Sequence, residues 1–548
     1  MSKFIVFNSH TEMPELPVSR ANMAWNKTGS WRSSTPGHRG KTAPCNFNCP
    51  AGEDIRGYLA LMKKGNVAEA FELLTAMNPL PAVCGRVCYH PCQAECNRHR
   101  FDTELQVRSV EQLIGDWGIQ NKRRLSFPTA QSKKVAVVGA GPAGLAAAHF
   151  LRRKGVAVVM YDENQYPGGI LHYGIPAYRL DKEVLQAELA RVIDGIEYKA
   201  NMRLGSDFDF GALDEFDALF IATGAHLSKQ MRINGEELPG VESGLDFLKR
   251  INSGQKVDMG DKKVLVIGGG NTACDVARSA YRLGASVTVA YRRTENEMPA
   301  FAEEVAQLKA EPIDLELLVA PARIERDGDG RLNVTCHRME LGEPDVDGRR
   351  RPVVIDGADF SLTADVVFAA IGEDPDMSLT PGLAYASDGT VDFSQIEPRI
   401  RDKLFLGGDI LPNPRTVPHA VASGRTAAEQ IVAFLRGEPY TVPEKLTVVA
   451  GPDDVNFNYF TRINIAKSAA SPAATGTLNQ AAAIEEANRC LSCGVCFECD
   501  NCYNFCPDLA VVRTPGGYKA NLDYCKGCGI CARECPSGSL GMQGGKVA

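Results

Sequence analysis

The sequence predicts an α/β protein in which two nucleotide-binding units, each built on a parallel sheet, lie between two cysteine-rich ends. Three observations support this fold class. Two glycine-rich turns each follow a short apolar segment typical of a buried strand, and each turn opens a helical stretch. Six of the 18 cysteines fall between residues 45 and 96, and ten more fall between residues 490 and 535. We therefore expect two Rossmann-like units with a separate cysteine-rich domain on either side.

The composition narrows the class of protein. In 548 residues, a hydrophobic fraction of 44% and 52 glycines are typical of a globular protein with about three or four domains. A net charge of -7 gives no reason to expect a nucleic-acid partner, and no apolar run is long enough to span a membrane. No secretory signal is visible at the N-terminus, so the cysteines indicate metal chemistry in a reducing cytoplasm rather than disulfides.

The N-terminal cysteines follow a polar segment, rich in Pro and Gly, that we interpret as an extended arm. Cys45 and Cys49 precede a helical stretch, and Cys84, Cys88, Cys92 and Cys96 then recur at every fourth position. Gly85 and Pro91 favour a loop over a helix for this last segment. A zinc site is the competing interpretation, although the C-x2-C pairs usual in zinc sites are absent here.

The first nucleotide-binding unit is predicted from residue 135 onward. A strand at Val135–Val138 leads into Gly139-x-Gly141-x-x-Gly144 and a helix, and a second strand ends at Asp162-Glu163. Such glycines let a pyrophosphate approach the N-terminus of the helix, and the acidic residue accepts hydrogen bonds from the ribose hydroxyls. The strand, helix and acid in register make this a strong dinucleotide-binding signal.

A second unit repeats the pattern with a different ribose site. The strand Val264–Ile267 leads into Gly268-x-Gly270-x-x-Ala273, and the following strand ends in Tyr291-Arg292-Arg293 without a carboxylate. Arginines at this position suit a 2′-phosphate, which favours NADP over NAD, unless they are merely solvated surface. Two such units in one chain imply one flavin and one nicotinamide nucleotide.

Further glycine turns accompany the two units. The segment LFIATGA contains Thr223 and Gly224, and LFLGGD would deliver Asp409 to the ribityl–phosphate chain of the flavin. His419 is expected near the flavin, but hydride transfer needs no protein base, so we assign no catalytic residue. No C-x2-C or C-x4-C pair flanks the flavin, which excludes a disulfide reductase, and Cys274 and Cys336 are interpreted as buried apolar residues.

The C-terminal cysteines have the spacing of a two-cluster ferredoxin. The pattern C-x2-C-x2-C-x3-C-P occurs twice, and in such proteins the fourth cysteine of each run ligates the other cluster. A disulfide framework is improbable because one spacing is repeated. The predicted ligand sets are Cys496, Cys499, Cys502 and Cys535 for one cluster, and Cys506, Cys525, Cys528 and Cys531 for the other.

The order of these motifs resembles that of the glutamate synthase small-subunit family, and the corresponding parts of dihydropyrimidine dehydrogenase are similar. The resemblance covers about residues 40 to 435 and is carried most specifically by CGRVCYHPC, PGGILHYGIPAYRL, GGGNTACDVARSA and YRRTENEMPA. With the added ferredoxin, the chain looks like the NAD(P)-reducing subunits attached to 2-oxoacid:acceptor oxidoreductases such as phenylglyoxylate dehydrogenase.

The resemblance implies the domain boundaries and the residues that contact each nucleotide. We expect an N-terminal arm (1–44), a helical iron–sulfur domain (45–130), an FAD-binding domain (131–250 and 365–440), an NAD(P)-binding domain (251–364), a linker (441–483) and the ferredoxin domain (484–548). The expected FAD contacts are Gly139, Gly141, Gly144, Glu163, Gly169, Leu171, Thr223, Gly224 and Asp409. The expected NAD(P) contacts are Gly268, Gly270, Asn271, Thr272, Arg292 and Arg293.

The family's N-terminal domain carries two [4Fe-4S] clusters, one of them with a non-cysteine ligand. For that cluster the resemblance implies Cys49, Cys88, Cys92 and Glu111, with Gln112 as the register-shifted alternative. The other cluster lacks its usual C-x2-C pair, but an RCLSCG segment occurs far away at Arg489–Gly494. We therefore hypothesise that Cys490 and Cys493 join Cys45 and Cys96, in the same chain or from a second subunit, which brings the expected clusters to four.

The expected function is electron exchange between NAD(P)(H) and a partner oxidoreductase through FAD and the clusters. A flavin is needed because the nicotinamide carries two electrons and each cluster carries one. No signature of a carbon-substrate site is present, so we expect a 2-oxoacid:acceptor oxidoreductase core as partner and reduction of NAD(P)+ as the direction. The alternatives are a glutamate synthase small subunit, a stand-alone NAD(P)H:ferredoxin or acceptor oxidoreductase, and a non-catalytic redox-sensing module.

Overall fold

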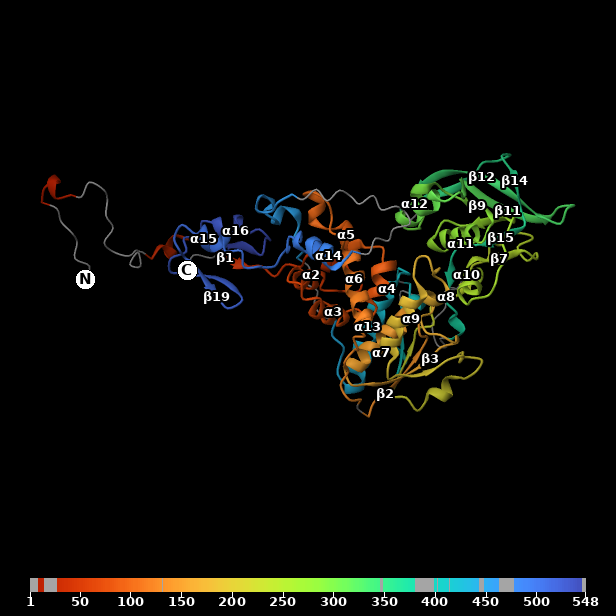
Figure 1. Cartoon of the computed structure of the whole chain (residues 1–548), viewed down its shortest axis with the longest axis horizontal. Helices are drawn as coiled ribbons and strands as arrows, with labels where there is room; N and C mark the ends of the chain where they lie inside the picture. The colour runs from red at the N-terminus through yellow and green to blue at the C-terminus, as the bar shows by residue number, and fades with distance from the viewer. Residues whose placement is uncertain are drawn as a thin grey trace.

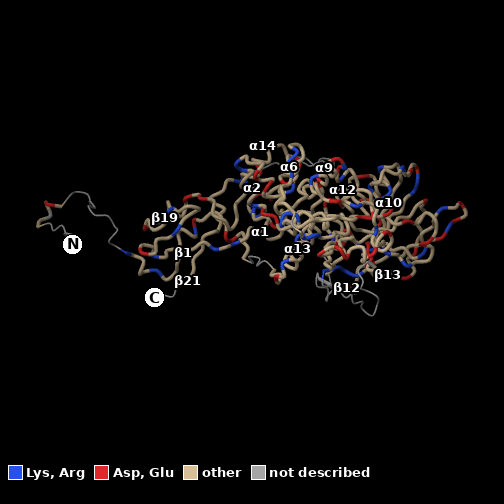
Figure 2. The backbone as a smooth tube through the Cα atoms, turned by 90° about the horizontal axis from the view of Figure 1, so that it is seen from below, with Lys and Arg blue, Asp and Glu red and all other residues tan. Residues whose placement is uncertain are grey.

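The protein is elongated, with its cysteine-rich C-terminal domain at one end and an antiparallel sheet at the other (Figure 1). The computed structural model describes residues 8–13, 27–130, 132–344, 348–379, 399–401, 403–412, 414–442, 448–462 and 478–544. Much of the predicted linker, at 443–447 and 463–477, therefore lies outside the described residues. Acidic and basic residues are interspersed along the whole length of the backbone (Figure 2). Within the described ranges, no helix is long and apolar enough to cross a membrane.

The FAD-binding unit is a six-stranded sheet in the order β17-β18-β5-β2-β3-β4. Its strands are β2 (Lys134–Val138), β3 (Ala157–Tyr161), β4 (Glu197–Lys199), β5 (Ala218–Ile221), β17 (Arg399–Arg401) and β18 (Leu404–Leu406). Helices α7 (Pro142–Arg153) and α13 (Val417–Arg436) pack closely on one another, because Gly424 brings the two backbones together. A Cβ at Gly424 would lie 2.1 Å from the carbonyl oxygen of Ala143. The helices α8 (Ile170–Tyr173) and α9 (Lys182–Ile193) complete the unit.

The NAD(P)-binding unit is a parallel five-stranded sheet in the order β10-β9-β8-β15-β7. Its elements are β7 (Val241–Ser243), α10 (Gly244–Asn252), β8 (Lys263–Ile267), α11 (Asn271–Arg282), β9 (Ser286–Tyr291), α12 (Ala302–Ala310), β10 (Asp314–Leu317) and β15 (Val366–Ala369). The NAD(P)-binding unit extends beyond the expected boundaries of 251 and 364, because β7 and β15 both pair within its sheet. An antiparallel sheet of β11 (Val319–Arg326), β12 (Leu332–Pro344), β13 (Arg350–Val354) and β14 (Phe360–Ala364) extends from it.

The N-terminal cysteine domain is helical. It contains α1 (Pro44–Asn48), α2 (Ile55–Lys63), α3 (Val67–Thr75), α4 (Pro81–Val87), α5 (Pro91–Ala94) and α6 (Val107–Gln120). The expectation of a loop around Cys84 to Cys96 was wrong in part, since α4 holds Cys84 and α5 holds Cys92. A proline at the first position of each helix opens it, and His90, with a φ of 55°, turns the chain between them.

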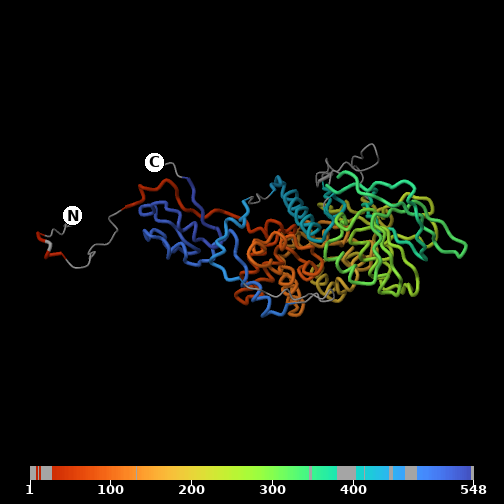
Figure 3. The backbone as a smooth tube through the Cα atoms, turned by 90° about the horizontal axis from the view of Figure 1, so that it is seen from above, coloured from red at the N-terminus to blue at the C-terminus, as the bar shows by residue number. Residues whose placement is uncertain are grey.

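The C-terminal domain is joined by the N-terminal arm, as the two backbone traces running side by side in Figure 3 show. Strand β1 (Ser34–His38) pairs antiparallel with β21 (Leu540–Gly544), the last described strand. The hairpin β19 (Val511–Thr514) and β20 (Gly517–Ala520) and the short helices α15 (Asn501–Asn504) and α16 (Ile530–Arg533) complete the domain. The predicted helix before it is α14 (Gln480–Asn488), which packs on α2 and α6.

Candidate functional site

The first cavity lies where the turn after β2 meets the loop after β5, and its lining contains most of the predicted FAD contacts. Gly139 adopts a φ of +102°, and a Cβ there would lie 2.3 Å from the carbonyl oxygen of Ala222. Gly141 and Gly169 face each other, since a Cβ at Gly169 would lie 3.0 Å from the Cα of Gly141. The predicted residues lining this cavity are Gly139, Gly141, Glu163, Gly169, Thr223, Gly224 and Asp409.

The chemistry of the cavity fits a flavin dinucleotide. The Thr223 hydroxyl and the Nδ1 atom of His226 are buried at its wall and have no hydrogen-bond partner within the described residues. Glu163 is partly exposed and lies 3.4 Å from Arg203, whereas its neighbour Asp162 is buried and accepts a 2.7 Å hydrogen bond from the Ala140 amide. Asp162 therefore stabilises the glycine turn, which leaves Glu163 as the acid available to a ribose.

Two predicted FAD residues lie behind the cavity wall. A Cβ at Gly144 would lie 1.9 Å from the carbonyl oxygen of Gly139, so this glycine allows the helix to contact the turn. Leu171 is fully buried in the apolar core, and its neighbour Ile170 lines the cavity instead. Successive side chains of a helix point about 100° apart, so Leu171 of α8 enters the core while Ile170 faces the cavity.

The second cavity lies at the carboxyl edge of the parallel sheet of the NAD(P)-binding unit and is lined by all six predicted NAD(P) contacts: Gly268, Gly270, Asn271, Thr272, Arg292 and Arg293. Gly268 has a φ of +145°, a conformation that favours glycine. Arg292 is exposed, while Arg293 is buried and donates a 2.8 Å hydrogen bond to the carbonyl oxygen of Arg350. Arg349, which the sequence interpretation missed, also lines this end.

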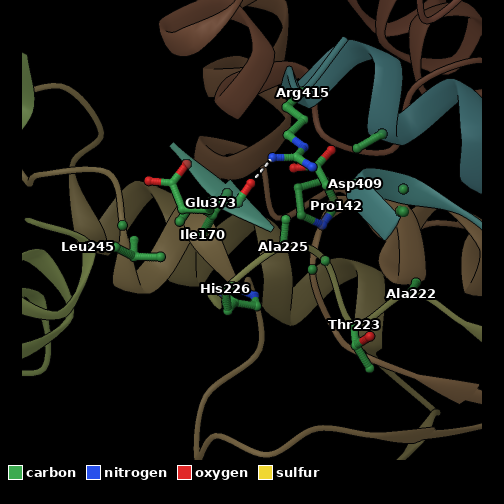
Figure 4. A pocket seen from close by; sticks show the side chains of 18 of the residues that line it. Pro142, Ile170, Ala222, Thr223, Ala225, His226, Leu245, Glu373, Asp409 and Arg415 are labelled. Carbon is green, nitrogen blue, oxygen red and sulfur yellow. Dashed lines mark hydrogen bonds between the residues drawn. The ribbon is translucent and has the colours of Figure 1, made fainter. Parts of the chain in front are cut away.

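The two cavities share part of their lining, including Thr272, Phe301, Glu373 and Arg415. Figure 4 shows Arg415 between Asp409 and Glu373, where its guanidinium donates to the Glu373 carbonyl oxygen. Burial raises the pKa of Asp409 to about 6, against the opposing charge of Arg415. Burial also raises the pKa of Glu373. A ring bound in either cavity would meet the other nucleotide at this junction.

An aromatic stack at the same junction joins three units of the fold. The ring of Tyr89, next to Cys88, lies 5.1 Å from the ring of Phe301 and 6.3 Å from the ring of His419. Arg108 also forms a 2.7 Å ion pair with Glu303 across the same boundary. These contacts hold the N-terminal cysteine domain against both cavities, and Val87 of that domain lines the first one.

The thiols of Cys49, Cys88 and Cys92 lie close enough to influence one another. Burial raises the pKa of the Cys92 thiol, and negative charge on Cys49 and Cys88 raises it further. Negative charge on Glu111 likewise raises the pKa of the Cys49 and Cys88 thiols, after burial. By contrast, the backbone of Gln112 packs against Gly85, where a Cβ would lie 2.5 Å from it. The structure therefore brings Glu111 to these three cysteines.

A buried carboxylate beside this set was not anticipated. Glu53 accepts a 2.8 Å hydrogen bond from the Asn78 amide, which also donates to Glu111 at 3.3 Å. Burial raises the pKa of Glu53 to about 7. Cys84, which the predicted ligand sets omit, is also buried and close to Glu111 and Cys88. The sequence offered only one signal for Glu53, its position four residues after Cys49.

The structure also brings Cys45, Cys96, Cys490 and Cys493 together within one chain. Burial raises the pKa of the Cys45 thiol, and negative charge on Cys490, Cys96 and Cys493 raises it further. The Asn97 amide donates to the Cys493 sulfur at 3.4 Å. Arg489, directly before this pair, is almost fully buried and donates to the Thr103 carbonyl oxygen at 2.7 Å.

The eight cysteines of the C-terminal domain fall into two groups. The pKa of Cys502 is raised by burial and then by negative charge on Cys499, Cys496 and Cys535. The pKa of Cys531 is raised by burial and then by Cys525, Cys506 and Cys528. The fourth cysteine of each run thus lies with the other run, as the spacing predicts. Thiolates and one carboxylate at such spacing fit iron–sulfur cubes; no group of three His, Cys, Asp or Glu in the described chain is arranged for a single metal ion.

Comparison with known families agrees with this geometry. Residues 133–424 match the family model described as pyridine nucleotide-disulphide oxidoreductase. Residues 35–123 match the model of dihydropyrimidine dehydrogenase domain II with its 4Fe-4S cluster, and residues 518–540 match a 4Fe-4S binding domain. The first match alone covers more than half of the chain.

Two curated relatives are similar to this chain over most of its length. The NADP(+)-dependent formate dehydrogenase subunit beta of Moorella thermoacetica is 37% identical over 72% of this chain, which spans 60% of that protein. The glutamate synthase [NADPH] small chain of Escherichia coli is 36% identical over 71% of this chain and 88% of its own length. The solved structure of a FprA variant from Mycobacterium tuberculosis is similar in fold, with a TM-score of 0.50 at 20% identity over 56% of this chain and 85% of its own.

Proposed function

This chain belongs to the pyridine nucleotide-disulphide oxidoreductase family and carries FAD, NAD(P) and [4Fe-4S] clusters, and from this premise we propose its function. It exchanges electrons between NADP(H) and a partner oxidoreductase. It would work as one subunit of a larger enzyme. The observation that carries the proposal is an unbroken series of cysteine groups between the flavin cavity and the surface of the ferredoxin domain.

Each group in the series borders the next. Val87 lines the flavin cavity and precedes Cys88 of the first group. Cys45 of the second group is among the charges that raise the pKa of Cys92 in the first. Between the second and third groups, the Gly494 amide donates at 2.7 Å to the carbonyl oxygen of Ser537, two residues after Cys535. Cys531 of the fourth group contributes to the raised pKa of Cys502 in the third.

FAD supplies the exchange between two-electron hydride chemistry and one-electron transfer. The role of the chain is to bind and orient the two nucleotides. The turns at Gly139–Gly141 and Gly268–Gly270 would admit the pyrophosphates to the starts of α7 and α11. Arg415 and Phe301 would exclude water from the junction at which the flavin and nicotinamide rings meet.

The second cavity supports NADP rather than NAD as the nicotinamide nucleotide. Three arginines, Arg292, Arg293 and Arg349, line one end of it, and the strand β9 ends without a carboxylate. Guanidinium groups bind phosphate oxygens in pairs, whereas a carboxylate at this position would bind the 2′-hydroxyl of NAD.

The ligand sets proposed for the four clusters are those that the structure brings together. For the first cluster, Glu111→Ala should leave three thiolates and alter the EPR signal of one cluster only. Gln112→Ala is the matched control, and it should leave every signal unchanged. If Gln112→Ala altered the signal and Glu111→Ala did not, the ligand assignment would be wrong.

The partner is proposed to be a 2-oxoacid:acceptor oxidoreductase core whose electrons reduce NADP+. The similarity to an NADP-dependent formate dehydrogenase subunit makes a formate-oxidising core the second candidate, and the 88% coverage of a glutamate synthase small chain makes that enzyme the third. Purifying the native complex and identifying its subunits separates the three. As a first test, the isolated flavin-replete chain should reduce methyl viologen with NADPH, and the flavin absorbance should bleach; absence of both would refute the proposal.

A further inference from the structure

One cysteine reaches the surface at the end of the series of cysteine groups. Among all 18 cysteines, which are described without exception, Cys528 alone is exposed. Around it lie four large apolar side chains that are also exposed: Trp31 (69%), Leu509 (82%), Leu522 (42%) and Ile530 (38%). We call Cys528 and these four residues the distal rim. Exposed apolar side chains gathered at one place are typical of a protein–protein contact surface.

Hydrogen bonds and an ion pair join the loops that carry the rim. The Asn521 amide donates to the Ala510 carbonyl oxygen at 2.6 Å, which places the loop of Leu522 beside the loop of Leu509. Asp508 and Lys526 form a 3.3 Å ion pair between the same two loops. The Gly29 amide donates to the Asp523 carbonyl oxygen at 2.8 Å, which brings the segment of Trp31 to the same place.

The rim encloses the group of Cys506, Cys525, Cys528 and Cys531. These four cysteines line one small cavity together with Pro36 from the N-terminal arm. This group is the last of the series, because the neighbouring group of Cys496 lies between it and Cys493. In Figures 1 and 3 the ferredoxin domain forms one end of the molecule, away from the nucleotide-binding units.

Two ion pairs lie at the rim, and the Arg32 guanidinium, next to Trp31, donates to the carbonyl oxygens of Gly29 and Leu522. Lys27 lies 3.1 Å from Asp523, and Lys526 lies 3.3 Å from Asp508. The rim therefore presents apolar groups beside two ion pairs and one guanidinium, so that apolar burial would hold a partner and Arg32 would add attraction to acidic groups.

We propose that the distal rim is the docking surface for a small iron–sulfur protein of the two-[4Fe-4S] ferredoxin type, which exchanges one electron at a time with the cluster of Cys528. This inference rests on the proposed electron-transfer function and adds a second partner, a small electron carrier, together with the site at which it docks. An iron–sulfur carrier suits the site because the last group of the series passes single electrons and its exposed ligand removes the need for an aqueous mediator.

The test uses the full chain with its cofactors and a purified two-[4Fe-4S] ferredoxin as the probe. Leu509→Glu and Ile530→Glu place charges on the rim, and Val442→Glu is the matched control, since Val442 is 75% exposed and lies outside the ferredoxin domain. Binding is measured by biolayer interferometry at two salt concentrations, and cluster content by EPR. Both rim variants should weaken ferredoxin binding about 10-fold or more with unchanged EPR signals, while the control binds as wild type.

Three outcomes would overturn the inference: no binding of ferredoxin by the wild type, unchanged binding by both rim variants, or a dimer that the rim variants convert to monomer, which would make a second copy the occupant. Failure of the proposed electron-transfer function can be distinguished from failure of this inference, because the wild-type chain would then not reduce methyl viologen with NADPH. The small dye needs no docking surface, so the rim variants should keep that activity.

Discussion

The guanidinium of Arg489 lies 3.3 Å from the carboxylate of Asp102, and both side chains are almost completely buried. Asp102 also accepts a 2.6 Å ion pair from Arg98, whose guanidinium in turn donates to the Arg489 carbonyl oxygen. This network connects the N-terminal cysteine domain to the residue directly before Cys490. It therefore fixes where the C-terminal pair of thiols meets Cys45 and Cys96.

Arg489→Met should remove the buried cation that pairs with Glu486 at 2.7 Å and with Asp102, and loss of a buried partner costs about 3–5 kcal/mol of folding free energy. We expect a lower thermal midpoint and loss of iron from one cluster, measured by scanning calorimetry and iron analysis. Arg513→Met is the control, because the Arg513–Asp500 pair is exposed to solvent and its loss should change stability little. Equal effects of both substitutions would contradict the importance of the network.

Cys490→Ser/Cys493→Ser should remove one N-terminal cluster and reduce the iron content by about a quarter, because four clusters are expected in all. The two ferredoxin-type EPR signals should remain. Cys336→Ser provides the control, since that thiol is buried in a sheet away from every group. Loss of a ferredoxin-type signal, or of none, would show that the two thiols do not complete the N-terminal site.

Two glycines of the first turn should respond in opposite ways to a methyl group. At Gly141 an alanine methyl would find no atom nearer than 4.0 Å, so Gly141→Ala should fold, but its methyl would occupy the space meant for the pyrophosphate. At Gly144 the methyl would lie 1.9 Å from the Gly139 carbonyl oxygen, so Gly144→Ala should fold poorly. Circular dichroism and bound flavin per chain distinguish the two cases; a flavin-replete Gly141→Ala protein would contradict this placement.

Arg292→Ala should raise KM for NADPH by about 10- to 100-fold and change KM for NADH little, because a hydrogen bond to a charged group contributes about 1.5–3 kcal/mol. Steady-state kinetics with methyl viologen as acceptor measures both constants. Arg351→Ala is a neighbouring exposed control that does not line the cavity. A parallel loss with both nucleotides would indicate that Arg292 does not contact the 2′-phosphate.

Asp275 should make stability depend on pH. It forms a 2.6 Å ion pair with Arg179 across the two nucleotide-binding units, and burial raises its pKa from 3.8 to about 6. A raised pKa in the folded state means that folding favours the protonated form, so the contribution of Asp275 to stability is full below pH 3.8, falls as the pH rises to about 6 and is constant above it. Asp275→Asn should remove that component from thermal midpoints measured between about pH 4 and pH 7. If Asp275→Asn left the dependence of the thermal midpoint on pH unchanged, the result would contradict this prediction.

The sequence interpretation succeeded where a local motif determines the geometry. The turns at Gly139 and Gly268 follow short buried strands, and the cysteine spacing alone separates Cys496 from Cys506 into different groups. Pairing Cys45 with Cys490 needed the resemblance to a family, because no local pattern relates residues so distant in the chain.

The remaining features depend on contacts between units. Tyr89, Phe301 and His419 come from three separate units, so nothing in their local sequence indicates that they stack. Glu373 and Arg415 likewise meet only when both sheets are assembled. The short helices at Cys84 and Cys92 were missed because glycine and proline were interpreted as loop formers, although proline at the first helical position stabilises a helix start.

The pairing of β1 with β21, together with the meeting of Cys45 and Cys490, sets an order on biosynthesis. The ribosome adds Cys490 and Cys493, the thiols that lie beside Cys45, more than 400 residues after Cys45 itself. Cys45 and Cys96 therefore remain without their partner thiols, and open to oxidation, while the two nucleotide-binding units are synthesised and fold. With the proposed ligand sets, a stop codon that falls after the N-terminal cysteine domain but before residue 490 would therefore cost three clusters rather than the two encoded beyond it.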